Sequence, residues 1–267
     1  MKLRNLGSTD LQVSPLGWGT VKLGRDQQVK YPTDFTLPDD HQAATLLALA
    51  QELGLNLLDT APAYGISEER LGKLLEKQRQ QWVICTKAGE EFAAGESSFD
   101  FTPAHLRFSL ERSLRRLRTD YLDLVLVHSD GRDTEIIERY EVFDQLEQFK
   151  RAGWIRAYGM STKTVEGGLL TAQHADVVMV TYNPWYEDEV AVIDECHKRN
   201  KGVLVKKALA SGHLDRDSAN ANADPVLTSL QLVLNYPGVT SAIVGTINPR
   251  HLHDNVMRAR HALKLDM

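Results

Sequence analysis

The sequence predicts an α/β fold: a (β/α)8 TIM barrel preceded by an N-terminal β-hairpin. Eight short apolar or β-branched runs alternate with segments of helical periodicity. Eight strand–helix units within 267 residues are typical of this barrel. No Pro/Ser-rich linker or low-complexity stretch interrupts the alternation, so we expect residues 1–267 to form a single barrel domain. A doubly wound parallel sheet has the same alternation and is the alternative, but the count of eight favours the barrel.

The hairpin is predicted from the first residues, where apolar and polar positions alternate on either side of a turn at residues 7–10. The apolar positions are Leu3, Leu6, Leu11 and Val13, and we expect the hairpin to plug the bottom of the barrel. The predicted barrel strands then follow in order at residues 16–19, 56–59, 82–86, 121–127, 155–159, 177–182, 202–206 and 241–244.

The helices are predicted from apolar stripes and from start signals. Thr102 followed by Pro103 is a typical helix start, and Ser67 is the expected N-cap of a shorter helix. Asp133 or Thr134 is expected to cap one continuous helix that reaches Phe149. The other predicted helices cover residues 39–53, 164–172, 187–199 and 225–236, and a last one opens at residues 248–249.

The composition excludes several classes of protein. Lys and Arg number 31 against 36 Asp and Glu, which gives a net charge of −5, and no basic stripe indicates a nucleic-acid partner. No apolar run approaches the roughly 18 residues of a membrane-spanning helix. Cys85 and Cys196 are too few for a disulfide framework, and we expect both to be small buried side chains. These features predict a soluble, cytoplasmic protein.

The usual short signatures of cofactor and metal sites are absent. Gly17-Trp18-Gly19 starts like a dinucleotide fingerprint, but Lys22 stands where the third glycine belongs. The chain has no Walker A, HExxH or GxSxG motif. His251 and His253 fall on a predicted exposed helix face, so we expect them to be solvated and predict no metal.

Polar residues at the ends of adjacent predicted strands are the strongest indication of a site. Asp59 ends the second strand, Lys87 the third and His128 the fourth, and Tyr64 follows Asp59 by five residues. Barrel enzymes keep their sites at this end of the strands. Free tyrosine has a pKa near 10, which an adjacent ammonium lowers, while a carboxylate holds the ammonium in place. With a histidine to orient a carbonyl, this set predicts protonation of an oxygen as hydride reaches its carbon.

At these residues the chain resembles the aldo-keto reductases over essentially its whole length. Leu16-Gly17-Trp18-Gly19-Thr20 is similar to the family's opening, and Asn56-x-x-Asp59-Thr60-Ala61-x-x-Tyr64-Gly65-x-Ser67-Glu68 is close to its signature. Thr86-Lys87, Leu126-Val127-His128, Gly159-Met160-Ser161, Leu209-Ala210-Ser211-Gly212 and Gly245-Thr246-x-Asn248 follow in the expected order. The resemblance implies NADPH-dependent reduction of an aldehyde or ketone, a sugar or another small carbonyl, to the alcohol. NADH is the alternative cofactor.

The resemblance also implies roles for individual residues. Tyr64 is then the general acid, Asp59 and Lys87 its tuning pair, and His128 the group that orients the carbonyl. The cofactor lies extended across the barrel top, and the substrate meets Trp18, Trp185 and Tyr186 in an open pocket. The expected cofactor-binding residues are Gly19, Thr20, Asp59, Ser161, Thr162, Met179, Lys206, Leu209, Ser211, Gly212, Leu214, Gly245, Thr246, Asn248, Arg250, His251 and Asn255.

Several positions depart from the family's pattern. Thr162 replaces an asparagine, Met179 replaces an amide-binding glutamine, and Lys206 replaces the aromatic residue that stacks on nicotinamide. Arg250 is the expected substitute for basic residues that clamp the 2′-phosphate. The departures keep open a cofactor-binding regulatory or interaction protein with little turnover. Schiff-base chemistry on Lys87 or Lys206 is a third, less favoured interpretation.

Overall fold

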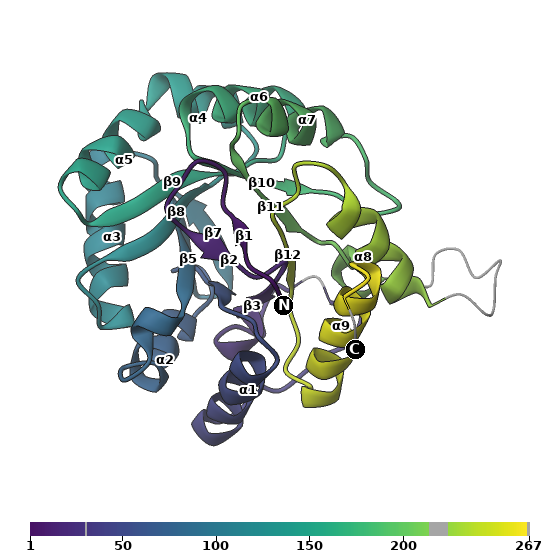
Figure 1. The fold of residues 1–267 in the computed structure, drawn as a ribbon. Coiled ribbons are helices and arrows are strands. Elements are labelled where there is room, and N and C mark those ends of the chain that lie inside the picture. Colours follow the sequence, from purple (N-terminus) through teal and green to yellow (C-terminus); the bar gives the residue numbers. More distant parts are fainter. Residues whose placement is uncertain (30, 214–223, 266–267) are drawn as a thin grey trace.

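The computed structural model describes residues 1–29, 31–213 and 224–265, and within them eight parallel strands close into a barrel (Figure 1). This confirms the predicted fold class. Going around the barrel, the strands are β3 (Leu16–Gly19), β4 (Leu57–Asp59), β5 (Val83–Ala88), β8 (Leu122–His128), β9 (Ile155–Ser161), β10 (Val177–Thr181), β11 (Gly202–Lys206) and β12 (Ser241–Val244). Apart from the inserted hairpin β6–β7, neighbours in the chain are neighbours in the barrel, so the strand ends of residues 59, 87 and 128 lie side by side.

A ring of helices surrounds the barrel (Figure 1). Their bounds are α1 (Asp40–Glu52), α2 (Ser67–Leu74), α3 (Pro103–Leu117), α4 (Asp133–Arg139), α5 (Val142–Arg151), α6 (Val165–His174), α7 (Val190–Lys198), α8 (Pro225–Asn235) and α9 (Pro249–Ala262). Short 3-10 turns form η1 (Val21–Leu23), η2 (Arg79–Gln81) and η3 (Ala210–Gly212). Thr102 caps α3 as expected, because its hydroxyl accepts a hydrogen bond from the backbone N–H of His105. No helix in the described ranges is both long and apolar enough to cross a membrane.

Three predictions about the helices were wrong. The single helix expected over residues 133–149 is divided into α4 and α5, because Glu141 adopts a left-handed backbone conformation with φ of 48°. Asp133 does not cap α4, since its Oδ2 accepts hydrogen bonds from the backbone N–H groups of Lys163 and Thr164. Ser67 is the first residue of α2, and its buried hydroxyl donates to Thr20 instead of capping the helix.

The N-terminal hairpin pairs β1 (Arg4–Asn5) with β2 (Gln12–Val13) and lies across one end of the barrel (Figure 1). Leu6, Leu11 and Val13 are at most 1% exposed and pack with the inward-facing strand residues, among them Cys85. The plug predicted from the sequence is therefore present. Leu3 differs from its three partners because it is 39% exposed.

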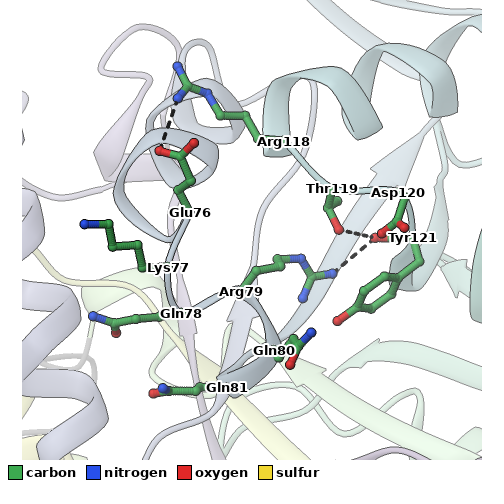
Figure 2. Close-up of a pocket in the computed structure, with 10 residues that line it drawn as sticks. All are labelled: Glu76, Lys77, Gln78, Arg79, Gln80, Gln81, Arg118, Thr119, Asp120 and Tyr121. Atoms are coloured by element: carbon green, nitrogen blue, oxygen red, sulfur yellow. Dashed lines mark hydrogen bonds and ion pairs between the residues drawn. The ribbon is translucent and has the colours of Figure 1, made fainter.

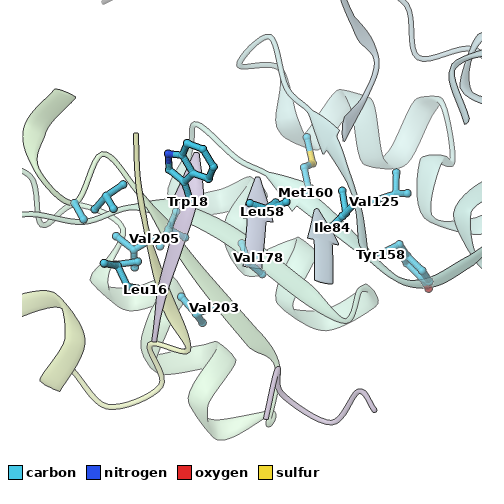
Figure 3. Close-up of a cluster of buried hydrophobic side chains, with 14 of the residues drawn as sticks. Leu16, Trp18, Leu58, Ile84, Val125, Tyr158, Met160, Val178, Val203 and Val205 are labelled. Carbon is cyan, nitrogen blue, oxygen red and sulfur yellow. The ribbon is translucent and has the colours of Figure 1, made fainter. Parts of the chain in front are cut away.

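A second, larger cluster fills the space between the barrel and its helices (Figure 3). The outward-facing strand residues drawn there include Leu58, Ile84, Val125 and Val178, all buried. Alternation along each strand thus places one set of side chains inside the barrel and the other beneath the helices. Apolar side chains cover most of both faces of the strands, whereas Asp59, Lys87 and His128 lie at or near the strand ends.

A hairpin that the sequence analysis did not predict follows β5. It pairs β6 (Glu90–Ala93) with β7 (Glu96–Phe99) through a two-residue turn at Ala94 and Gly95, both with positive φ. Gly89 also has a positive φ, of 105°, and marks the point where the chain leaves the barrel. The hairpin carries Glu90 back toward the strand ends, next to His128 of β8.

The close approach of β9 and β10 gives a stability prediction. A Cβ on Gly159 would lie 1.8 Å from the carbonyl oxygen of Val177, which is backbone and cannot move aside alone. We expect Gly159→Ala to lower the free energy of unfolding by ~3 kcal/mol or more, because the two strands must separate. Gly153→Ala is the control: Gly153 has a φ of 79° but no neighbour within 4 Å, so only about 1 kcal/mol of backbone strain is expected. Urea unfolding measures both variants, and equal losses would contradict the crowding argument.

Candidate active site

A buried ion pair lies at the centre of the strand ends. Lys87 Nζ donates to Asp59 Oδ1 at 2.7 Å and to the carbonyl oxygen of Thr60 at 2.8 Å. The two side chains are only 2% and 7% exposed. Burial lowers the pKa of Lys87, but Asp59 and Tyr64 more than offset this, so the pKa is raised and the ammonium persists. The expected partnership of Asp59 and Lys87 is therefore present in the geometry.

Tyr64 lies over this pair. A turn closed by its backbone N–H and the carbonyl of Ala61 follows β4, and Lys87 Nζ lies 4.7 Å from the centre of the Tyr64 ring. Burial raises the pKa of Tyr64 and Asp59 adds to the rise, while Lys87 lowers it. The net direction is upward, so the lysine restrains the pKa of the phenol without taking it below its ordinary value. This corrects the simpler picture of a phenol acidified by its neighbour, because desolvation is the larger effect.

His128 ends β8 beside the phenol. The rings of Tyr64 and His128 are 6.3 Å apart and nearly perpendicular. Glu90 of the β6–β7 hairpin places Oε2 2.6 Å from Nδ1 of His128. Burial, aided by Lys87 and Lys206, lowers the pKa of His128 although Glu90 raises it. The four residues expected to be catalytic therefore meet at one place, joined by a carboxylate that the sequence analysis missed.

A cleft of about 750 Å³ opens above these residues and runs toward α9. Asp59, Tyr64 and His128 line one part of it. The expected cofactor-binding residues that line it are Gly19, Asp59, Lys206, Leu209, Ser211, Gly212, Gly245, Thr246, His251 and Asn255. Arg258 of α9, which the sequence analysis did not single out, also lines the cleft and forms an ion pair with Asp224 at 2.6 Å.

Other expected site residues lie elsewhere. Trp18 is fully buried and its indole N–H donates to the carbonyl of Thr246, so it supports the cleft from beneath instead of facing substrate. Met179 is packed inside the barrel, and the Thr20 hydroxyl is buried against the carbonyl of Asp59. Asn248 caps α9. Arg250 is exposed and borders neither hollow near the strand ends, and Leu214 lies outside the described residues.

Lys206 separates the main cleft from a neighbouring hollow of about 650 Å³. Its Nζ donates to Ser161 Oγ at 2.9 Å and to the Thr162 carbonyl at 2.5 Å. Burial lowers the pKa of Lys206 to about 8 although Glu189 opposes the shift. The hollow is lined by Ser161, Thr162, Trp185 and Tyr186 and shares His128 with the cleft. Two residues expected to bind the cofactor, Ser161 and Thr162, therefore line the same hollow as two expected to bind substrate.

A further hollow lies far from this chemistry, between the segments that precede β5 and β8 (Figure 2). Arg79 there donates to the carbonyl of Tyr121, and Arg118 faces Glu76. These segments enter the barrel at the amino ends of the strands, opposite the Asp59–Lys87 pair. Among the described residues, no three His, Cys, Asp or Glu side chains gather as a metal site, and His251 and His253 are exposed as expected.

Known proteins resemble this chain in both sequence and fold. A sequence model of the Aldo/keto reductase family matches residues 15–229. The crystal structure of PA4992 of Pseudomonas aeruginosa, assigned to the aldo-keto reductases, superimposes with a TM-score of 0.88 at 58% identity, covering 98% of this chain and 95% of that one. The uncharacterised oxidoreductase YqkF of Bacillus subtilis is 27% identical over 97% of this chain and 91% of its own length. The L-galactose dehydrogenase of Arabidopsis thaliana is 34% identical over 60% of this chain and 48% of its own length.

The lowered pKa of Lys206 makes a prediction about stability. Because its pKa falls from 10.5 unfolded to about 8 folded, the charged form is disfavoured in the native state. Wild-type stability should therefore rise with pH between about 8 and 10.5. Lys206→Met lacks this titration, so its stability should not change in this way. As pH falls from 10.5 to 8, the free energy of unfolding of Lys206→Met should therefore rise relative to that of wild type by about 1–2 kcal/mol, after allowance for partial solvent screening. Lys206→Arg, which stays charged, is the control. Urea unfolding across this range is the measurement, and a difference independent of pH would contradict the assignment.

Proposed function

The chain belongs to the aldo/keto reductase family, and on that premise we propose that it is an NADP(H)-dependent oxidoreductase that reduces an aldehyde or ketone to the alcohol. The observation that carries the proposal is the meeting of Tyr64, His128 and the Asp59–Lys87 pair at one cleft. The proposed substrate class is a sugar or another small carbonyl, in keeping with the relative named for L-galactose.

In the proposed mechanism Tyr64 donates its phenolic proton to the carbonyl oxygen. Lys87 stabilises the phenolate that remains, because its ammonium is held under the ring by Asp59 and the Thr60 carbonyl. His128 lies beside the phenol and, as the imidazolium, donates a hydrogen bond to the same oxygen, which fixes the carbonyl between the two rings. A reduced nicotinamide cofactor supplies the hydride when it is bound.

The cleft residues fit an extended dinucleotide. Gly19 and Gly245 carry no side chain on its floor, and a Cβ on Gly245 would come within 3.1 Å of the Tyr31 hydroxyl. Ser161 and Lys206 offer polar groups at the catalytic end. At the other end His251, Asn255 and Arg258 supply donors for phosphate, with Arg258 also paired with Asp224. NADPH is the proposed cofactor because the resemblance to the family implies it, and NADH is the alternative.

A second candidate is a cofactor-binding regulatory or interaction protein with little turnover. It is favoured by Lys206, whose ammonium stands where the family carries an aromatic ring, and by Met179, which is packed in the barrel core. Both functions use the cleft, but only the reductase requires the Tyr64 phenol to donate a proton. A variant that removes only the phenolic hydroxyl therefore separates them.

Tyr64→Phe is that variant. We expect it to lower the turnover of carbonyl reduction by at least ~10², because the general acid is lost while the ring remains. Titration with NADPH and with NADH, followed by quenching of tryptophan fluorescence, is the binding measurement on the same samples. NADPH should bind wild type and the variant alike, and more tightly than NADH does. An unchanged rate would remove Tyr64 from the mechanism. NADPH binding to wild type without measurable reduction would favour the regulatory candidate.

A further inference from the structure

Glu90 is a buried acid outside the four residues of the proposed mechanism. Its Oε2 lies 2.6 Å from Nδ1 of His128, and the side chains of Glu90 and His128 are only 12% and 19% exposed. The other oxygen, Oε1, accepts a hydrogen bond of 2.7 Å from the hydroxyl of Ser97 on β7. One carboxylate thus joins the hairpin to the ring at the end of β8.

The hairpin holds Glu90 in place from several sides. The guanidinium of Arg25 stacks 3.4 Å from the ring centre of Phe92 on β6. Residues 90–93 and 96–99 are fully paired, and the backbone N–H of Asp100 donates to the carbonyl of Gly89. Burial alone would raise the pKa of Glu90, but His128, Ser97 and Arg25 hold it at about 2. The carboxylate is therefore ionised throughout the working pH range and has only lone pairs to offer.

An ionised carboxylate 2.6 Å from Nδ1 favours a proton on that nitrogen, because an unprotonated Nδ1 would hold its lone pair close to a negative charge. Building on the proposed function, we propose that Glu90 is a positioning residue that confines the single proton of neutral His128 to Nδ1. Nε2 is then a hydrogen-bond acceptor in the neutral ring and a donor only in the imidazolium. The same logic makes the buried carboxylate of a serine-protease triad fix the tautomer of its histidine.

The charged and titratable groups around His128 decide how long the imidazolium persists as pH rises. Glu90 of β6 favours the cation, whereas Lys87 of β5 and Lys206 of β11 oppose it. Tyr64 adds a phenol edge-on, and Arg25 acts through Glu90. Lys163, Lys207, Glu189 and His213 line the adjoining hollow that His128 also borders.

Reduction needs a hydrogen-bond donor for the carbonyl oxygen, which His128 provides only as the imidazolium. Reduction should therefore decline from mildly acid to alkaline pH. Alcohol oxidation, which is served by an acceptor for the hydroxyl proton, should be retained there.

The direct test is the nitrogen-15 NMR spectrum of the histidine rings in the free protein. The His128 signals are assigned with His128→Gln. We expect neutral His128 to be protonated at Nδ1 alone in wild type, and Glu90→Gln to shift protonation wholly or partly to Nε2, because an amide can also donate to Nδ1. Glu91→Gln is the matched control, since Glu91 is the next residue and pairs instead with Arg112 and His105. Wild-type protonation at Nε2, or a Glu90→Gln spectrum identical to wild type, would overturn the proposal.

The pH profile of reduction supplies a second, functional readout. For wild type and Glu91→Gln, we expect kcat/KM to fall at least tenfold between pH 5.5 and 8. For Glu90→Gln we expect it to change less than threefold, since a neutral ring can then donate from Nε2. Identical profiles for Glu90→Gln and wild type would overturn the positioning role. Absence of reduction in every variant, with the NMR result as expected, would overturn the proposed function while supporting the tautomer assignment.

Discussion

The ion pair between Lys87 and Asp59 is the constraint on which the rest of the site depends. Both groups are almost completely removed from water, and each is held by the end of a neighbouring barrel strand. Removing either partner would leave an uncompensated buried charge, which is strongly destabilising. The closed barrel provides the rigidity that keeps the pair at 2.7 Å, and the pair in turn fixes a cation beneath the Tyr64 ring.

The site buries ionisable groups, which lowers the stability of the fold, and the apolar barrel offsets this loss. Lys206 stays buried with a pKa lowered to about 8, and the Tyr64 phenol is desolvated beside a carboxylate. Cores packed on both faces of every strand supply the compensating stability. Buried ionisable groups are retained at functional sites because the chemistry requires them. Selection for stability alone would favour apolar residues at these positions. The N-terminal plug closes the opposite end of the barrel with the buried side chains of Leu6, Leu11 and Val13.

The barrel and the four proposed catalytic residues were predictable because both depend on local patterns. Apolar runs define strands, and residues at adjacent strand ends must converge once the barrel closes. Glu90 was missed because its position depends on an excursion from the barrel, for which Ala94-Gly95 was the only turn signal. Trp18 was expected to face substrate, but strand alternation and its bond to Thr246 turn it into the core. The break between α4 and α5 could not be predicted, because Glu141, where it occurs, is not a helix-breaking residue type.

Control of the proton donor by the buried pair is tested by the pH dependence of carbonyl reduction by Lys87→Met, with NADPH binding measured on the same samples. We expect NADPH binding to change less than about threefold while turnover falls by at least ~10². In any residual activity, the alkaline limb that the Tyr64 phenol sets should move to still higher pH, because the phenolate loses its cation. Thermal unfolding confirms that the variant is folded. A folded Lys87→Met protein with the wild-type rate and pH profile would show that the buried pair does not control the proton donor.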